Sequence, residues 1–191
     1  MDHLLREAAP GDILPAVVTG CTAFGAFCDV GCGAAALLGT QQLCISRLRH
    51  AGEMLTPGQR IYAAIRTLDR VQRRVFLTQR ELLGTWAENA ARFCAGQTVT
   101  GVVRSLTDYG AFIELTPNLS GLAEDDGTLR VGDHVAVYIR AIVPETLKIK
   151  LSVLHRVEPQ PRPALRYMQT EGHIRQWRYG NEEFAKYYTI F

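Results

Sequence analysis

The sequence contains an internal repeat, and this feature limits the folds open to the chain more than any other. Residues 11–39 align with residues 96–124 without a gap at an offset of 85 residues, so that "CTAFGAFCDV" matches "LTDYGAFIEL". Farther along, "GQRIYAAIRTLD" aligns with "GDHVAVYIRAIV" at an offset of 74 residues, which leaves eleven extra residues in the first copy. We therefore expect two copies of one structural unit.

Each copy alternates apolar and polar residues in short runs separated by Gly, Asn, Asp or Pro, a pattern typical of short strands. In the second copy the predicted strands cover residues 98–106, 109–115, 120–124, 134–143 and 147–153. Five strands within about 60 residues are too few for a sandwich and fit a small closed barrel. Gly25 and Gly110 fall inside the strand pattern, where we expect a bend that a side chain would obstruct. The predicted fold is all-β, with two five-stranded barrels.

The segments outside the two copies predict a helix and a tail. In "LLGTWAENAARFCAG", Thr85 and Glu88 have capping-box spacing, and Trp86, Ala90 and Phe93 follow on one helical face. In "EPQPRPAL", three alternating prolines hold the chain extended. The expected organisation is a first barrel at 1–82 with its core at 11–82, a short linker helix at 83–95, a second barrel at 96–157, and a proline-rich linker with an aromatic tail at 158–191.

Charge is distributed unevenly, although the net charge of the chain is only +2. Residues 11–82 hold eight arginines against five acidic residues, whereas residues 96–153 hold five basic residues against seven acidic ones. Six arginines crowd into the stretch 60–80: Arg60, Arg66, Arg70, Arg73, Arg74 and Arg80. Such a patch suits a phosphate-binding surface, because neutralising phosphates releases counterions. The alternative is an ordinary solvated hairpin.

Several classes of protein are not expected. No apolar run approaches the roughly 20 residues that span a bilayer, and "MDHLLREAAPGD" does not resemble a signal peptide, so a cytoplasmic location is expected. The five cysteines form no CxxC pair and have no histidine at zinc-ligand spacing, which favours reduced thiols over a metal site. No P-loop, GxSxG or HExxH motif is present, and neither an enzyme nor a cofactor is expected.

A strand with aromatic residues on both sides of Gly-Ala presents flat faces on which unstacked bases can stack. Such stacking contributes roughly 1–3 kcal/mol per base and depends little on sequence. The alternative is that these aromatic residues belong to the barrel core, as aromatic residues in strands usually do.

The tail is also rich in aromatic residues. Residues 165–191 contain seven of the sixteen aromatic residues of the chain. They are interleaved with the basic residues Arg166, Arg175, Arg178 and Lys186. Two roles are open: the rings stack on an RNA strand, or they fill a groove between the barrels and anchor the C-terminus, since an exposed aromatic tail would favour aggregation.

The second copy resembles the RNA-binding domain named after ribosomal protein S1, an OB-fold barrel. "GQTVTGVV", "LTDYGAFIEL" and "LSGLAE" carry this resemblance, and "VTGCTAFGAFCDVG" in the first copy is similar. The pairs "VGDHVAVYIRAI" with "LKIKLS" and "PGQRIYAAIRTL" with "RRVFLT" resemble the last two barrel strands. The resemblance covers residues 11–82 and 96–153.

The resemblance implies an RNA-binding face on each barrel. In the family this face combines two aromatic residues, a third-strand histidine, and an acid and a base near the last hairpin. The RNA-binding residues predicted in this sequence are Phe24, Phe27, Arg66, Asp69, Arg74, Tyr109, Phe112 and Lys148. The histidine is absent from both copies, where Gly39 and Glu124 align, and Val143 lies near the place of the acid in the second copy.

These departures favour the first barrel as the main site, because Glu124, Asp125 and Asp126 repel phosphate. The expected function is that of an S1-type RNA-binding protein linked to translation or mRNA handling. Its expected partner is single-stranded RNA, with the ribosome or an mRNA as the setting and neither a membrane nor a small-molecule substrate. The alternative is a protein-interaction adaptor whose barrels have lost RNA binding.

Overall fold

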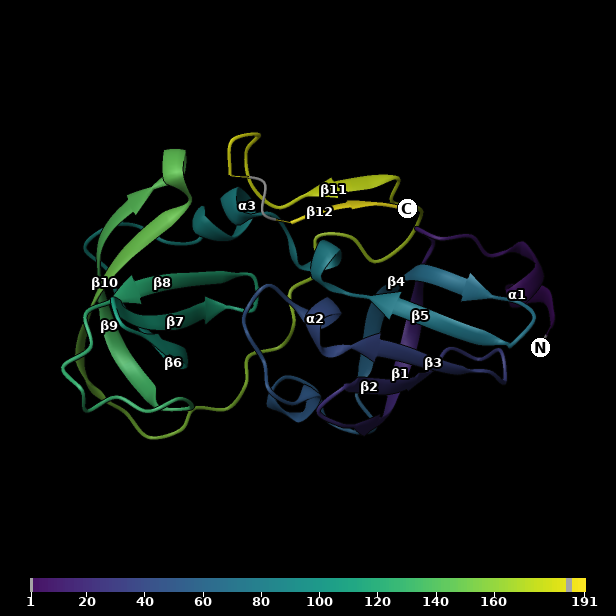
Figure 1. Ribbon diagram of the computed structural model, residues 1–191, viewed down its shortest axis with the longest axis horizontal. Helices are drawn as coiled ribbons and strands as arrows, with labels where there is room; N and C mark the ends of the chain where they lie inside the picture. The colour runs from purple at the N-terminus through teal and green to yellow at the C-terminus, as the bar shows by residue number, and fades with distance from the viewer. Residues whose placement is uncertain (1, 185–186) are drawn as a thin grey trace. The chain divides into compact units, whose positions relative to one another are not determined.

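The computed structural model describes residues 2–184 and 187–191, and the first sequence copy folds into a closed five-stranded barrel (Figure 1). Its strands are β1 (Ile13–Cys21), β2 (Gly25–Asp29), β3 (Ala35–Gly39), β4 (Arg60–Asp69) and β5 (Arg74–Thr78), which neighbour one another in the order β1-β2-β3-β5-β4. Only β3 and β5 pair in parallel. The short helices of this half are α1 (Asp2–Glu7), α2 (Thr40–Leu43), η1 (Ala51–Glu53) and η2 (Arg80–Leu83).

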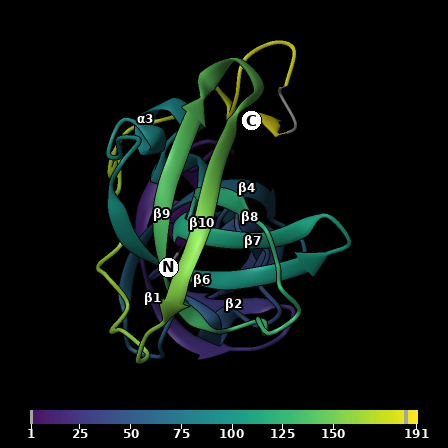
Figure 2. The ribbon, with the colours of Figure 1, turned by 90° about the vertical axis from the view of Figure 1, so that its left-hand side faces the viewer.

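The second copy forms another closed five-stranded barrel with the same pattern of pairing (Figure 2). Its strands are β6 (Thr98–Thr107), β7 (Gly110–Thr116), β8 (Leu119–Ala123), β9 (His134–Val143) and β10 (Lys148–Arg156), in the order β10-β8-β7-β6-β9, and η3 (Pro144–Thr146) precedes β10. Here β8 and β10 are the parallel pair. The predicted fold class is confirmed, and the five strands predicted in this copy lie close to the observed ones.

Each barrel encloses its own apolar interior, because alternate residues of every strand point inward. The fully buried side chains of the first barrel include Leu38, Ile61, Ile65 and Leu77, and those of the second include Ile113, Ile139 and Ile149. Side chains of the opposite register point outward, so the aromatic residues at those positions lie on the barrel surface.

The bends predicted at the two strand glycines are present. Gly25 has a φ of +152° and Gly110 a φ of +147°, in a region that side chains with a Cβ rarely adopt. A Cβ on Gly25 would lie 2.3 Å from the carbonyl oxygen of Leu38, and one on Gly110 would lie 2.4 Å from that of Ala123. Glycine therefore allows the neighbouring strand to approach at this corner in both barrels.

The predicted helix between the copies is α3 (Trp86–Ala90), which is shorter than expected. Its capping box is confirmed: the Thr85 hydroxyl accepts from the Glu88 amide (3.2 Å), and the Glu88 carboxylate accepts from the Thr85 amide (2.7 Å). At the other end, Phe93 donates its amide to Ala90 at 3.0 Å. This bond spans three residues, which is typical of a tightened last turn, and the helix ends before the predicted boundary.

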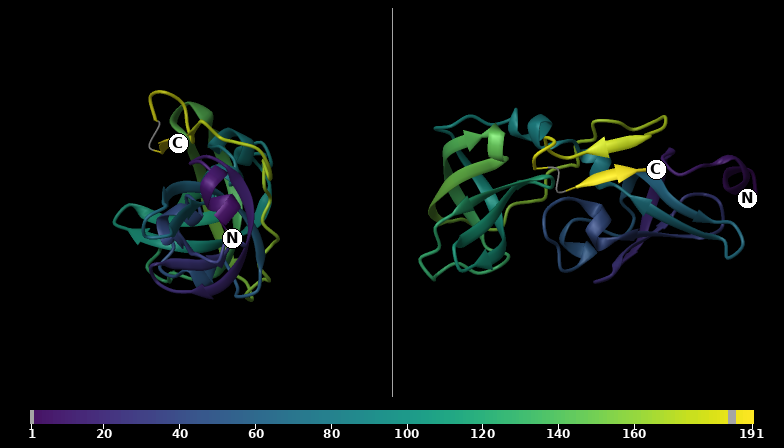
Figure 3. Two further views of the ribbon diagram at one scale, coloured as in Figure 1. Left: turned by 90° about the vertical axis from the view of Figure 1, so that its right-hand side faces the viewer. Right: turned by 45° about the horizontal axis from the view of Figure 1, so that its top comes forward.

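The tail, expected as one segment, is divided between two compact units. Residues 165–177 and 188–191 belong to the unit of the first barrel, and residues 178–187 to that of the second. β11 (Gln176–Arg178) and β12 (Tyr188–Ile190) form a two-stranded sheet, drawn as the two yellow arrows in the right panel of Figure 3. Lys186, one of the basic residues noted in the tail, lies outside the described residues. Among the described helices, none is both long and apolar enough to cross a membrane.

Candidate nucleic-acid interface

The turn between β1 and β2 holds Phe24 in an exposed position. The Thr22 hydroxyl accepts from the amides of Phe24 (3.1 Å) and Gly25 (3.2 Å), and it donates to the Gly25 carbonyl (3.0 Å). The Phe24 carbonyl accepts from the amide of Thr40 at 3.0 Å. The backbone on both sides of Phe24 is therefore fixed, while its ring is 84% exposed. This exposure excludes the core alternative for Phe24.

A second aromatic residue lies on the outer face of β2 and a third on that of β5. Phe27 is 45% exposed and Phe76 is 38% exposed. Phe27 pairs with Leu37 on β3, and Leu37 pairs with Phe76, so the three side chains lie side by side on one face. Phe76 was not among the residues predicted from the resemblance. The alternation in "RRVFLT" places it outward, but only the pairing through β3 aligns it with Phe27.

Exposed arginines accompany these rings. Arg74 begins β5, two residues before Phe76, so both side chains leave the same face of the strand. Arg66 is exposed at the β-bulge between Ile65 and Thr67. Arg80, which the sequence placed in the same basic patch, is only 12% exposed and forms an ion pair with the buried Glu81 at 3.4 Å. It does not contribute to the free basic surface.

Asp69 has a local structural partner. Its carboxylate accepts from the amide of Gln72 at 2.8 Å and so closes the turn between β4 and β5. Its Cα is paired with that of Arg74. In this geometry Asp69 shapes the hairpin that carries Arg74.

The corresponding face of the second barrel is more enclosed. Tyr109 is 70% exposed, but Phe112 is only partly exposed, and the two rings meet edge to face at 6.0 Å and 88°. Lys148 is exposed at the start of β10, where it pairs with Val143. All eight predicted site residues are therefore on outer faces or turns, but on the second barrel the two aromatic rings contact each other.

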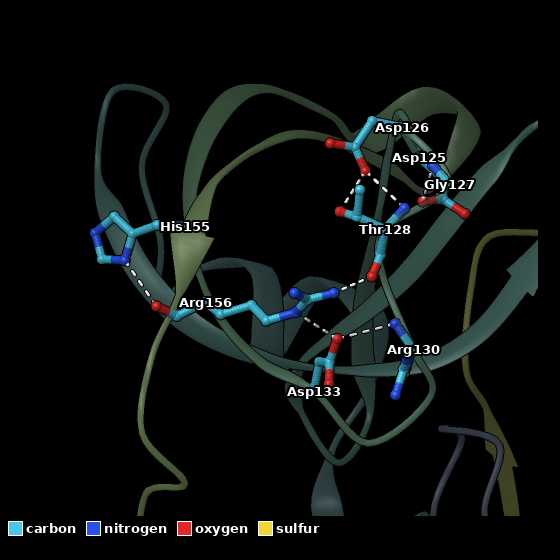
Figure 4. Close-up of polar contacts among 8 residues, drawn as sticks. All are labelled: Asp125, Asp126, Gly127, Thr128, Arg130, Asp133, His155 and Arg156. Carbon is cyan, nitrogen blue, oxygen red and sulfur yellow. Dashed lines mark hydrogen bonds and ion pairs between the residues drawn. The ribbon is translucent and has the colours of Figure 1, made fainter.

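An acidic loop follows β8 in the second barrel (Figure 4). The hydroxyl of Thr128 (2.6 Å) and its amide (2.9 Å) donate to Asp126, and these two bonds lower the pKa of Asp126. The Arg130 amide and the Arg156 guanidinium likewise lower the pKa of Asp133. A carboxyl group with a lowered pKa remains ionised to more acidic pH, so both groups carry negative charge at neutral pH. Arg156 is paired with Asp133 at 2.8 Å, and its positive charge is thereby offset.

A pocket of about 440 Å³ lies beside this loop. Its lining combines acidic, basic and apolar side chains, among them Glu124, Asp125, Asp126, Arg140, Leu151 and His155. In the first barrel, α2 contacts the end of β5. The side-chain oxygen of Gln42 accepts from the Thr78 hydroxyl (3.2 Å), and the Gln42 backbone carbonyl accepts from the Gln79 amide (2.8 Å). The equivalent stretch of the second copy, residues 124–133, is irregular and contains no helix.

Several aromatic residues of the tail are buried or bonded to other parts of the chain. The Tyr167 hydroxyl accepts from Gln79 Nε2 at 2.6 Å, its ring meets Tyr62 edge to face at 5.3 Å, and burial raises its pKa. Trp177 and Tyr179 are buried at 9% and 8% exposure. These three residues support the anchoring role. Phe184 and Tyr188 remain partly exposed.

The described residues contain no group of three or more histidine, cysteine, aspartate or glutamate side chains that could hold a metal ion.

Part of the chain matches a known family: residues 7–80 match the S1 RNA binding domain family. The chain is 31% identical to small ribosomal subunit protein bS1 of Leuconostoc lactis over 166 residues, covering 79% of this chain and 38% of that protein. It is 30% identical to bS1 of Staphylococcus aureus (strain COL) over 188 residues, covering 89% of this chain and 48% of that protein. The chain thus spans about half the length of these relatives or less.

Among solved structures, a multidomain protein with nucleic acid binding domains from Streptococcus pneumoniae TIGR4 is similar over 82% of this chain and 57% of its own. The TM-score is 0.35 and the identity 16%.

Proposed function

Because this chain is an S1 RNA-binding domain protein related to ribosomal protein bS1, we propose that it binds single-stranded RNA through the outer face of its first barrel. It acts by binding and not by catalysis. The observation that supports the site is the exposure of Phe24 and Phe27, together with Arg74, which leaves the face of β5 that Phe76 shares with Phe27 through Leu37. Large apolar rings left in water beside a basic residue are typical of a surface that receives a partner.

The chemistry of this face suits an unpaired strand. Flat rings offer stacking energy to any base that is not already stacked in a duplex, at roughly 1–3 kcal/mol per base. Arg74 and Arg66 supply the phosphate contacts that determine the salt dependence of such binding. Duplex RNA hides its bases in the helix, so we expect it to bind more weakly than an unstructured strand.

The second barrel is the weaker site in this proposal. The Tyr109 ring already packs against Phe112, so less aromatic surface is free. The acidic loop adds negative charge that repels phosphate at close range. Lys148 occupies the place of Arg74 and Arg140 that of Arg66, so the ranking rests on the aromatic residues and the acidic loop.

We further propose a cytoplasmic role in translation or mRNA handling, with the ribosome or an mRNA as the setting. The basis is the similarity to bS1, a small ribosomal subunit protein.

Fluorescence anisotropy of the full chain with a labelled unstructured RNA, matched DNA and duplex RNA tests the proposal. Phe24→Ala and Phe27→Ala should each weaken RNA binding by roughly 1–3 kcal/mol, the value of one stacked base. Tyr109→Ala and Phe112→Ala, the matched changes in the second barrel, should have a smaller effect. A larger effect in the second barrel would show that the two sites are ranked wrongly.

The salt dependence provides the second readout. Arg74→Ala should lower affinity for all sequences and reduce the slope of log affinity against log salt by about one, as expected for one phosphate contact. Lys148→Ala should change the slope less. If the wild-type chain binds none of the three probes, the proposal fails and the adaptor alternative, whose barrels bind protein, gains support.

A further inference from the structure

A row of outward side chains crosses three strands of the first barrel. Phe27 on β2, Leu37 on β3 and Phe76 on β5 occupy directly paired positions. Both phenylalanine rings are exposed by more than a third of their area, and Leu37 between them is partly exposed. The apolar surface therefore continues from the predicted aromatic pair to the far side of the barrel face, where Thr67 is the next paired residue.

The second barrel shows that barrel construction does not require an aromatic residue at this place. There Phe112 pairs with Leu122, and Leu122 pairs with Lys150, so Lys150 occupies the position of Phe76. Lys150 is exposed, and β10 forms with it in place. Since a lysine satisfies the fold at the equivalent position, folding alone does not account for the exposed phenylalanine in β5.

We infer that Phe76 is a third base-stacking position of the first barrel, an inference that rests on the proposed function. Two strand spacings, about 10 Å, separate its backbone from that of Phe27, with Leu37 between them. The two rings are therefore too far apart to share one base, and Phe76 receives a base of its own farther along the strand.

The surroundings of Phe76 provide what a neighbouring nucleotide needs. Arg74 leaves the same face of β5 about 7 Å away along the strand, which places a guanidinium beside the phosphate of a base stacked on Phe76. No acidic residue takes part in the row of Phe27, Leu37, Phe76 and Thr67. The RNA strand accordingly runs across β2, β3 and β5, and the first barrel contacts at least one nucleotide more than the Phe24–Phe27 pair alone.

The test uses full-length variants and labelled uridine oligonucleotides of increasing length. Phe76→Leu retains an apolar side chain but removes the flat ring, and should weaken binding about 5- to 150-fold, the loss of one stacked base. Phe76→Tyr retains the ring and should bind like the wild type. Phe76→Lys, which installs the residue of the second barrel, should also bind more weakly once salt screens its charge.

Oligonucleotide length gives a readout that a general loss of stability would not produce. The affinity of Phe76→Leu should stop rising at an oligonucleotide one nucleotide shorter than for the wild type, and circular dichroism should show unchanged folding. If Phe76→Leu binds like the wild type while Phe27→Ala binds weakly, the third stacking position is overturned and the proposed function stands. If Phe24→Ala, Phe27→Ala and Phe76→Leu all bind like the wild type, the proposed function itself is overturned.

Discussion

A single missing Cβ decides whether β2 can follow its path beside β3. Gly25 combines a φ of +152° with a carbonyl oxygen 2.3 Å from the place of a Cβ. Gly25→Ala should therefore destabilise the chain by about 1–3 kcal/mol, the usual cost of a residue held in a sparsely populated backbone region. Urea unfolding followed by circular dichroism measures the free energy of unfolding.

Gly20→Ala is the matched control in the same barrel, because its Cβ meets nothing within 4 Å and its φ is ordinary. It should be close to neutral. Equal unfolding free energies for the two variants would contradict the assignment of Gly25 as a steric requirement of the corner.

At the scale of one element, α3 is short enough that its cap should be a large part of its stability. The Thr85 hydroxyl is the partner of the Glu88 amide, and the buried Asn89 donates its side chain to the Thr85 carbonyl at 2.9 Å. Thr85→Ala should cost roughly 0.5–2 kcal/mol. Hydrogen exchange at the Glu88 amide should become faster, because that amide loses its acceptor.

Thr85→Ser retains a hydroxyl at the cap and is the control. It should leave exchange at Glu88 close to that of the wild type. Unchanged exchange in Thr85→Ala would mean that packing of the helix, and not the capping box, holds the first turn.

At the scale of the whole molecule, the tail contributes to both compact units. In the first unit, the Ile174 amide donates to the Gly11 carbonyl and the Ile13 amide to the Gly172 carbonyl, both at 2.9 Å, and the Tyr167 hydroxyl accepts from Gln79 Nε2. In the second, the Tyr179 carbonyl accepts from the amide of Trp86 at 2.9 Å. Ending the chain after residue 164 should destabilise it by more than about 3 kcal/mol, since buried aromatic side chains are lost.

Thermal unfolding should show this as a midpoint lower by several degrees. Glu158→Ala, in the exposed linker before the tail, is the control and should leave the midpoint unchanged. A truncated chain as stable as the full chain would show that the tail packs on the barrels without stabilising them.

Local patterns of the sequence were sufficient for the strands, the capping box and the glycine corners. Period-two alternation reports which residues face a core, and the spacing of Thr85 and Glu88 reports one turn of helix; neither depends on distant residues. The sequence left open whether Phe24 and Phe27 are exposed or in the core, and both are exposed: Phe27 because it takes an outward position of β2, and Phe24 because it lies in the turn before that strand.

Only the tertiary structure decided which side chains share the face. Phe76 and Phe27 lie 49 positions apart in the sequence, and they become aligned only through the parallel register of β3 and β5. Arg80 belongs to the same arginine-rich stretch as Arg74, yet the pairing with buried Glu81 removes it from the surface. The sequence of the aromatic tail fits two roles equally well: rings that stack on an RNA strand, and rings that anchor the C-terminus. Packing resolves this for Tyr167, Trp177 and Tyr179, because burial depends on which surfaces the distant chain segments present to them.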